Sequence, residues 1–165
     1  MNVRNNTFWK NIAFDWAGVS SEVAFSHPFF DNQEVEIFLG EEFDEEGEEV
    51  GTLPTEEELK AYENTYKAFL ENIAQHLSAI QQAAYQRYRE VYAAYYESEE
   101  KSGAPPLQIT SVEAHNPYIK ELLYLKITED NTLRVLIRYQ LDEEHGLEFK
   151  FVNGKLVTIG GIAET

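Results

Sequence analysis

Apolar residues recur with helical spacing through the middle of the chain. Between Leu59 and Tyr95 they return about every 3.6 residues, which is the period of an α-helix. Thr55 and Glu58 have the spacing of a capping box, so the helix is predicted to begin just after Thr55. The apolar positions of this stripe are Leu59, Tyr62, Tyr66, Phe69, Ile73, Leu77, Ile80, Ala84, Tyr88, Val91 and Tyr95.

A straight helix over this whole stripe would be too long for a compact domain. At 1.5 Å per residue it would run for roughly 60 Å, whereas a domain of this size is only about 40 Å across. We therefore expect a break or bend near Asn72, with two helical segments that pack on a sheet.

Alternating apolar and polar residues predict strands before the helix. Residues 8–16 alternate, with Phe8, Ile12, Phe14 and Trp16 on the apolar face and Trp9 on the other face. A weaker strand is predicted at 22–25 and a clearer one at 34–39, followed by a loop over 40–54 that is rich in acids and glycine.

The last third of the chain is also rich in predicted strands. Residues 122–128 and 132–141 flank one turn, and residues 147–152 and 155–159 flank Asn153-Gly154, which is typical of a hairpin. Strands, then helix, then strands indicate an α+β fold. We expect one domain over 1–165, with an antiparallel sheet of about six or seven strands and the long, bent helical segment packed on one face.

The charge of the chain narrows the classes of partner. The 165 residues include 30 acids and 13 bases, which leaves a net charge of −17. Residues 31–60 hold 13 of the acids and a single base, Lys60. Such a surface repels nucleic acids and anionic membranes and attracts a basic protein. The plainer interpretation, that the charge only keeps the protein soluble, stays open.

The amino-acid sequence also argues against cysteine-based sites, a membrane span and several enzyme motifs. With no cysteine, the chain can form neither disulfides nor thiolate zinc sites nor cysteine nucleophiles. No stretch approaches the roughly 18 apolar residues that a membrane span needs. We expect a cytoplasmic protein. No G-x-S-x-G, P-loop or G-x-G-x-x-G motif is present, so a non-enzymatic role without a cofactor is expected.

The acidic loop partly matches a calcium-binding pattern. Glu42, Asp44 and Glu46 fall at positions 1, 3 and 5, and Gly47 falls at the required glycine. Position 12, where a bidentate glutamate should close the site, is Leu53. The pattern therefore fails at its most important ligand, so we expect a solvated loop without a specific metal site. Weak attraction of cations to the loop stays open as an alternative.

A second acidic cluster, Asp142-Glu143-Glu144-His145-Gly146, lies between two predicted strands. Three carboxylates and an imidazole can bind a metal or transfer protons, so one hypothesis is a metal-dependent hydrolase centred on Asp142, Glu144 and His145. On a tight turn, however, these side chains should splay apart. We therefore favour a polar connection that ends in a glycine, with a recognition loop as the next alternative.

Four tyrosines crowd the end of the predicted helix. Tyr88 and Tyr95 belong to the apolar stripe, whereas Tyr92 and Tyr96 flank it. Tyrosine suits both the edge of a core and an interface. A homodimer through this end of the helix is therefore one alternative.

Several segments together carry a family resemblance. They are the D-E-E-H-G turn with Leu141 and Leu147, Asn153-Gly154-Lys155, Ile159-Gly160-Gly161, Trp16, and the aromatic stretch 61–70. The chain resembles a family of small acidic bacterial proteins of unknown function, which typically have a tryptophan where Leu141 stands. Such proteins resemble the immunity proteins of polymorphic toxin systems. The resemblance implies a protein that blocks a toxin by binding it.

The leading hypothesis is a non-enzymatic acidic binding protein, of the immunity type, that occludes a basic partner. The alternatives are a structural or regulatory homo-oligomeric module and, third, the metal-dependent hydrolase. The residues predicted to bind the partner are Glu41, Glu42, Asp44, Glu45, Glu46, Glu48, Glu49, Asp142, Glu143, Glu144 and His145.

Overall fold

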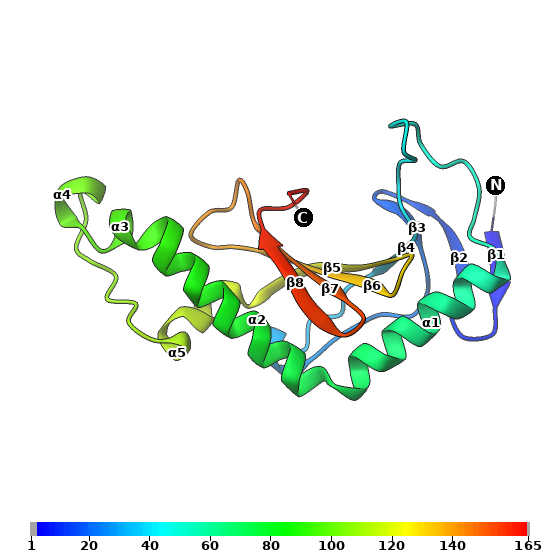
Figure 1. Ribbon diagram of the computed structural model, residues 1–165, viewed down its shortest axis with the longest axis horizontal. Helices are drawn as coiled ribbons and strands as arrows, with labels where there is room; N and C mark the ends of the chain where they lie inside the picture. Colours follow the sequence, from blue (N-terminus) through cyan, green and yellow to red (C-terminus); the bar gives the residue numbers. More distant parts are fainter. Residues whose placement is uncertain (1–2, 165) are drawn as a thin grey trace.

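The long helical segment bends once and then extends beyond the sheet. The computed structural model describes residues 3–164 (Figure 1). Helix α1 (Glu56–Glu71) begins at a complete capping box between Thr55 and Glu58, and α2 (Ile73–Arg87) follows directly after Asn72. The predicted bend near Asn72 is therefore confirmed. Beyond α2, the chain leaves the sheet through α3 (Ala93–Tyr96) and α4 (Glu99–Ser102), and it returns through α5 (Val112–His115).

Eight strands form one open sheet in the order of the sequence. They are β1 (Val3–Asn6), β2 (Lys10–Asp15), β3 (Gly18–Ser20), β4 (Ile37–Leu39), β5 (Glu121–Thr128), β6 (Thr132–Arg138), β7 (Leu147–Val152) and β8 (Lys155–Gly160). The predicted α+β class is confirmed. The sheet is mixed, however, because β4 and β5 are parallel. The helical segment connects these two strands, and a crossover of this kind allows parallel pairing.

The predicted strands near the N-terminus differ from the observed ones. The segment 22–25 forms no strand, and Phe25 makes a single bridge to Val35. The strand predicted at 34–39 is shortened to β4. The hairpin around Asn153-Gly154 is present as predicted, between β7 and β8.

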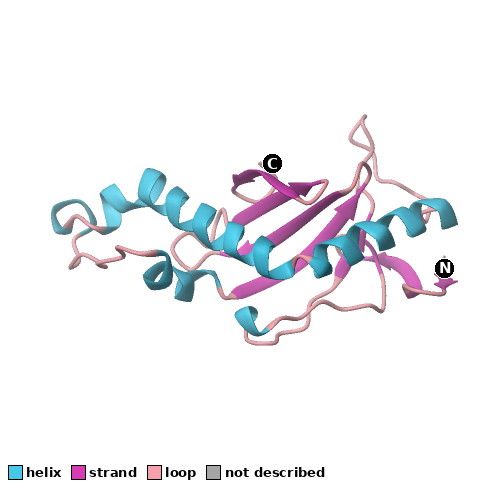
Figure 2. Ribbon diagram, turned by 60° about the horizontal axis from the view of Figure 1, so that its bottom comes forward, coloured by secondary structure: helices cyan, strands magenta, loops and turns pink. Residues whose placement is uncertain are grey.

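The core lies between the helices and one face of the sheet. Figure 2 shows the helical segment crossing that face. Leu125, Val135 and Phe149 are in register across β5, β6 and β7, and all three are buried beneath the helices. Leu59, Tyr66 and Ile80 of the predicted stripe contribute to the same core. No helix within residues 3–164 covers the opposite face of the sheet (Figures 1 and 2).

The two tryptophans exchange their predicted environments. Trp9 is 0% exposed, and its indole N–H donates to the carbonyl of Leu59 at 3.0 Å. Trp16, by contrast, is 65% exposed. The alternation of a strand does not extend back to Trp9, because Lys10 has a φ of 66°. At the other end β2 stops at Asp15, so Trp16 lies in the turn before β3.

A π-helical turn, η2 (Tyr88–Tyr92), changes which tyrosines face the protein. The N–H of Ala93 bonds to the carbonyl of Tyr88, five residues back. The extra residue rotates the following positions by about 100° relative to a regular helix. The prediction that Tyr95 continues the core stripe is therefore wrong, since Tyr95 is 50% exposed.

No helix in the described part of the chain is long and apolar enough to cross a membrane.

Candidate functional site

The acidic loop folds as a small hairpin built around Asp44. The backbone N–H groups of Glu46 and Glu48 both donate to Oδ1 of Asp44, each at 2.9 Å. Backbone bonds join Asp44 to Glu48 and Val50 to Glu42, and Gly47 at the tip has a φ of 83°. Glycine adopts this left-handed conformation without strain. Asp44 therefore orders the loop as well as adding to its charge.

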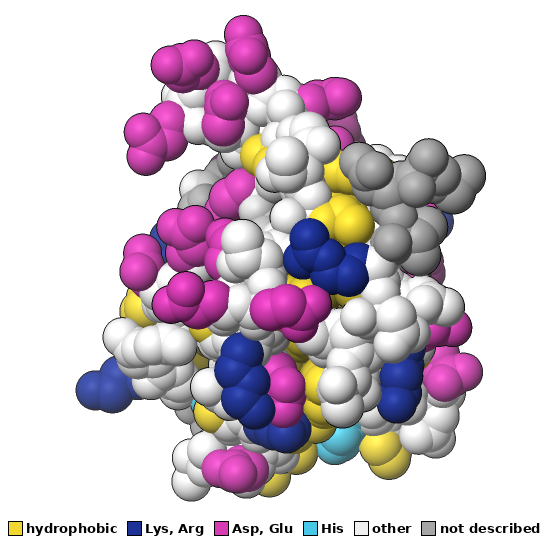
Figure 3. Space-filling view, turned by 90° about the vertical axis from the view of Figure 1, so that its right-hand side faces the viewer, with side chains coloured by type: hydrophobic (Ala, Val, Ile, Leu, Met, Phe, Trp, Pro, Cys, Tyr) yellow, Lys and Arg dark blue, Asp and Glu magenta, His cyan; other side chains and the backbone are white. Residues whose placement is uncertain are grey.

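The loop stands away from the body of the protein and presents its carboxylates to solvent. Figure 3 views the molecule from the right-hand side of Figure 1, and there Asp and Glu side chains gather at the top, above the Lys and Arg side chains. At the base of the loop, Glu41 contacts Lys126 at 3.8 Å and Arg134 at 3.9 Å. Within residues 3–164 no ion pair involves the remaining acids of the loop, which are Glu42, Asp44, Glu45, Glu46, Glu48 and Glu49.

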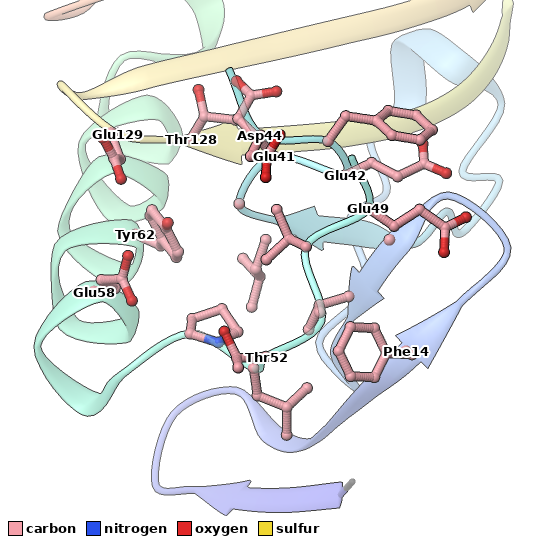
Figure 4. Close-up of a pocket in the computed structure, with 18 of the residues that line it drawn as sticks. Phe14, Glu41, Glu42, Asp44, Glu49, Thr52, Glu58, Tyr62, Thr128 and Glu129 are labelled. Carbon is pink, nitrogen blue, oxygen red and sulfur yellow. The ribbon is translucent and has the colours of Figure 1, made fainter. Parts of the chain in front are cut away.

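An open hollow of about 920 Å³ surrounds the base of the loop. Figure 4 shows Glu58, Tyr62 and Glu129 on one side of it, and Glu42, Glu49 and Phe14 on the other. Nine acidic side chains line the hollow, against two basic ones, Arg134 and Lys150. The acidic residues are Asp15, Glu41, Glu42, Asp44, Glu45, Glu49, Glu58, Glu129 and Asp130. A cationic surface is therefore the complement of this lining.

Large aromatic side chains are exposed at the same place. Phe14 is 43%, Trp16 is 65% and Phe43 is 48% exposed, and all three line the hollow. Exposed aromatic groups beside charged ones are typical of protein interfaces. The family resemblance includes Trp16, but the sequence pattern did not predict that these three aromatic residues lie beside the loop.

The carboxylates of the loop are not arranged around a metal. Asp44 directs Oδ1 to the backbone of its own loop, as described above. In residues 3–164 no group of three or more histidine, aspartate or glutamate side chains is placed to hold a metal ion. The same finding covers the second acidic cluster.

That second cluster, the turn 142–146, lies at the far end of β6. Because β6 has seven residues, it separates the turn from the acidic loop by roughly 20 Å at the rise of a strand. The predicted binding residues therefore fall into two places. The C-terminal residues pack on the turn, since the N–H of Ile162 bonds to the carbonyl of His145 at 2.7 Å.

Within this turn, two of the side chains meet. His145 Nδ1 lies 2.9 Å from Oδ1 of Asp142, and the hydroxyl of Tyr92 donates to Oδ2 of Asp142 at 2.6 Å. The prediction that the side chains splay apart is wrong for this pair. It fails because the turn closes back on Asp142, whose Oδ1 also accepts the backbone N–H of His145. Glu143 turns aside to Arg138, 2.8 Å away.

The contact shifts both pKa values in the direction that favours an ion pair. The hydrogen bond to Asp142, followed by its charge, raises the pKa of His145. Burial raises the pKa of Asp142, but hydrogen bonds from Tyr92 and His145 outweigh burial and leave that pKa below its ordinary value. The stabilisation from His145 is full below its ordinary pKa and is lost as pH rises through the raised pKa. The stabilisation from Asp142 is lost as pH falls through its lowered pKa.

Replacing Asp142 by asparagine should lower the pKa of His145, because the carboxylate that favours the imidazolium is removed. An NMR titration of the histidine ring protons measures this directly. His76, whose pKa burial lowers, lies on α2 and serves as the internal control. An unchanged pKa of His145 in Asp142→Asn would contradict the pairing.

A family model described as "Domain of unknown function (DUF6985)" matches residues 7–164. Neither a curated protein nor a solved structure matches the chain significantly.

Proposed function

We propose that this chain, which belongs to the DUF6985 family of domains of unknown function, is a non-enzymatic binding protein that holds a basic protein partner against its acidic loop. The lining of the hollow carries the proposal, because its acids outnumber its bases nine to two. Charge complementarity of this kind steers a partner toward the surface and excludes partners of like charge.

The acidic loop presents its negative charge to solvent, where a partner can reach it. Its tip carries Glu45, Glu46, Glu48 and Glu49, which are all exposed. No ion pair within residues 3–164 neutralises them. The hairpin bonds of Asp44 order the backbone that carries these side chains, so less conformational entropy is lost when a partner binds.

The exposed aromatic side chains favour a protein as the partner. A charged loop alone supplies long-range attraction, whereas the residues that dominate the energy of protein interfaces are mostly tryptophan, tyrosine and arginine. Phe14, Trp16 and Phe43 supply such contact area at the foot of the loop. A nucleic acid has the same sign of charge as this surface and is disfavoured.

The most specific form of the proposal is an immunity-type inhibitor. A toxin that acts on nucleic acids needs a basic cleft, and an acidic surface that covers this cleft blocks the substrate. The mechanism is occlusion, so it requires no chemistry from the inhibitor. A gene for a large secreted toxin next to the gene for this chain would identify the candidate partner.

Salt should control the binding. We expect the affinity for the partner to fall at least about tenfold between about 0.1 M and 1 M salt, because the screening length falls from about 10 Å to about 3 Å. The measurement is capture of proteins from the source cells on the immobilised chain at low salt, followed by titration calorimetry of the recovered partner across this range. The proposal is lost if no basic protein is retained at low salt, or if its affinity does not depend on salt.

A further inference from the structure

Trp16 is fixed in place although most of its surface faces solvent. Its ring packs edge to face on Phe38, with ring centres 5.3 Å apart, and on Tyr124, with centres 5.2 Å apart. Phe38 is 0% exposed and belongs to β4, so the base of this cluster is rigid. The face of the sheet involved is the one without helices, since Phe38 pairs in register with Lys126 while Ile37 and Leu39 on either side join the core. An indole held this way is preorganised to receive a ligand.

Two carboxyl groups lie against this tryptophan. The indole N–H of Trp16 donates to Oε1 of Glu36 at 3.2 Å, and the backbone N–H donates to Oδ1 of Asp15 at 2.8 Å. Asp15 also accepts a hydrogen bond from the hydroxyl of Ser20 at 3.0 Å. The sequence separates Asp15 from Glu36 by 21 positions. The pairing of β2 with β3, and of β3 with β4, brings them together.

Both carboxyl groups accept a hydrogen bond from Trp16, and each changes the pKa of the other. Asp15 raises the pKa of Glu36, which burial raises further, whereas Glu36 and the backbone N–H of Trp16 lower the pKa of Asp15. Two neighbouring acids cannot both be ionised without repulsion. Within residues 3–164 no ion pair involves either group. The site therefore gains from a cation that the described part of the chain does not provide.

The combination of groups fits one kind of cation best. A guanidinium is planar, stacks on an aromatic face, and donates several N–H bonds in one plane to neighbouring carboxylates. A lysine ammonium is a compact point charge and matches the two carboxylates less well. We propose that the Trp16 surface, formed by Trp16, Asp15 and Glu36, binds an arginine side chain of the protein partner.

This assignment rests on the proposed function and adds an anchor to it. Asp15 and Trp16 line the same hollow as the acidic loop. The loop attracts the partner over a distance, and the Trp16 surface then fixes one arginine by contact. Cation–π stacking and hydrogen-bonded charge pairs are both short-ranged, so they determine the orientation of the partner.

The two tryptophans of the chain make a direct binding test possible. In ¹⁵N-labelled wild-type protein, each indole N–H gives one signal, and Trp16→Phe identifies the signal of Trp16. The ligand is N-acetyl-arginine amide, and its neutral match is the corresponding citrulline compound. We expect the Trp16 signal to shift saturably with arginine, in the millimolar range typical of a single side chain at about −4 kcal/mol. The signal of buried Trp9 should stay unchanged.

Three results would overturn the assignment. They are a Trp16 signal that does not respond to arginine, an equal response to citrulline, and an equal response to N-acetyl-lysine amide. The double variant Asp15→Asn/Glu36→Gln should remove the response to arginine, because the acceptor charges are gone while the side chains keep their size. A response that persists in this variant would also count against the carboxyl pair.

Affinity for the partner separates this inference from the proposed function. Trp16→Ala should weaken binding about 30-fold, as expected when an aromatic anchor is removed. If charge reversal of the acidic loop weakens binding on the order of 100-fold and Trp16→Ala does not change the affinity, the arginine anchor is wrong and the proposed function stands. If neither change alters the affinity, both are wrong.

Discussion

Replacing Glu45, Glu46, Glu48 and Glu49 together by lysine should weaken binding of the basic partner on the order of 100-fold. Each replacement turns an attraction to the partner into a repulsion. An exposed ion pair contributes about 0.2–1 kcal/mol, and four such changes add up. The fold should survive, since no ion pair within residues 3–164 uses these side chains. Titration calorimetry measures the affinity, and thermal unfolding followed by circular dichroism checks the fold.

The matched control reverses four other exposed glutamates. Glu71, Glu90, Glu99 and Glu100 lie on the helical segment, away from the acidic loop. Replacing them by lysine changes the net charge of the chain by the same amount. We expect this variant to bind within about threefold of the wild type, because at physiological salt charges farther away than about 8 Å are screened. An equal loss in both variants would assign the effect to net charge, and no loss in the loop variant would remove the loop from the mechanism.

Trp9→Ala should destabilise the protein by about 3–5 kcal/mol, the usual range for truncating a large buried aromatic side chain. Trp9 is fully buried, and its ring lies 4.8 Å from that of Phe8 and 5.8 Å from that of Tyr66. The change also leaves the carbonyl of Leu59 without the indole N–H. Urea unfolding of the wild type and the variant gives the difference in the free energy of unfolding.

The same substitution at Trp16 is the natural comparison. Trp16→Ala should reduce the free energy of unfolding by only about 1 kcal/mol, because the indole keeps most of its surface in water and loses mainly its contacts with Phe38 and Tyr124. The two variants therefore distinguish Trp9, which stabilises the fold, from Trp16, which is available to a partner. A larger loss at Trp16 than at Trp9 would contradict this assignment.

Short-range patterns predicted the helical segment well. The capping box of Thr55 and Glu58 correctly predicts the start of α1. The bend near Asn72 follows because the apolar helical stripe is longer than a domain of this size. Asn153-Gly154 correctly predicted a hairpin. Each of these predictions depends on residues close together in the chain, so a single sequence contains the information.

Predictions that needed distant contacts were less successful. The apolar alternation of 8–16 continues through Trp9 and Trp16, but only packing against Leu59 and Phe38 determines which tryptophan is buried. The one-residue shift at η2 is likewise absent from the 3.6-residue pattern. For the candidate site, the acidic loop was predicted as a stretch of sequence, whereas the Asp15–Glu36 pair exists only because β2 pairs with β3 and β3 pairs with β4.

The sequence by itself determined the α+β class, the helical stripe with its bend, and the concentration of acids in 31–60, because periodicity, capping and composition are local properties. Only the tertiary structure decided that β4 and β5 run parallel, that Tyr92 contacts Asp142, and that Trp16 stands exposed beside two carboxyl groups. These features arise when segments tens of residues apart pair or pack. Burial, charge and hydrogen bonding at each position then depend on neighbours that the local pattern does not contain.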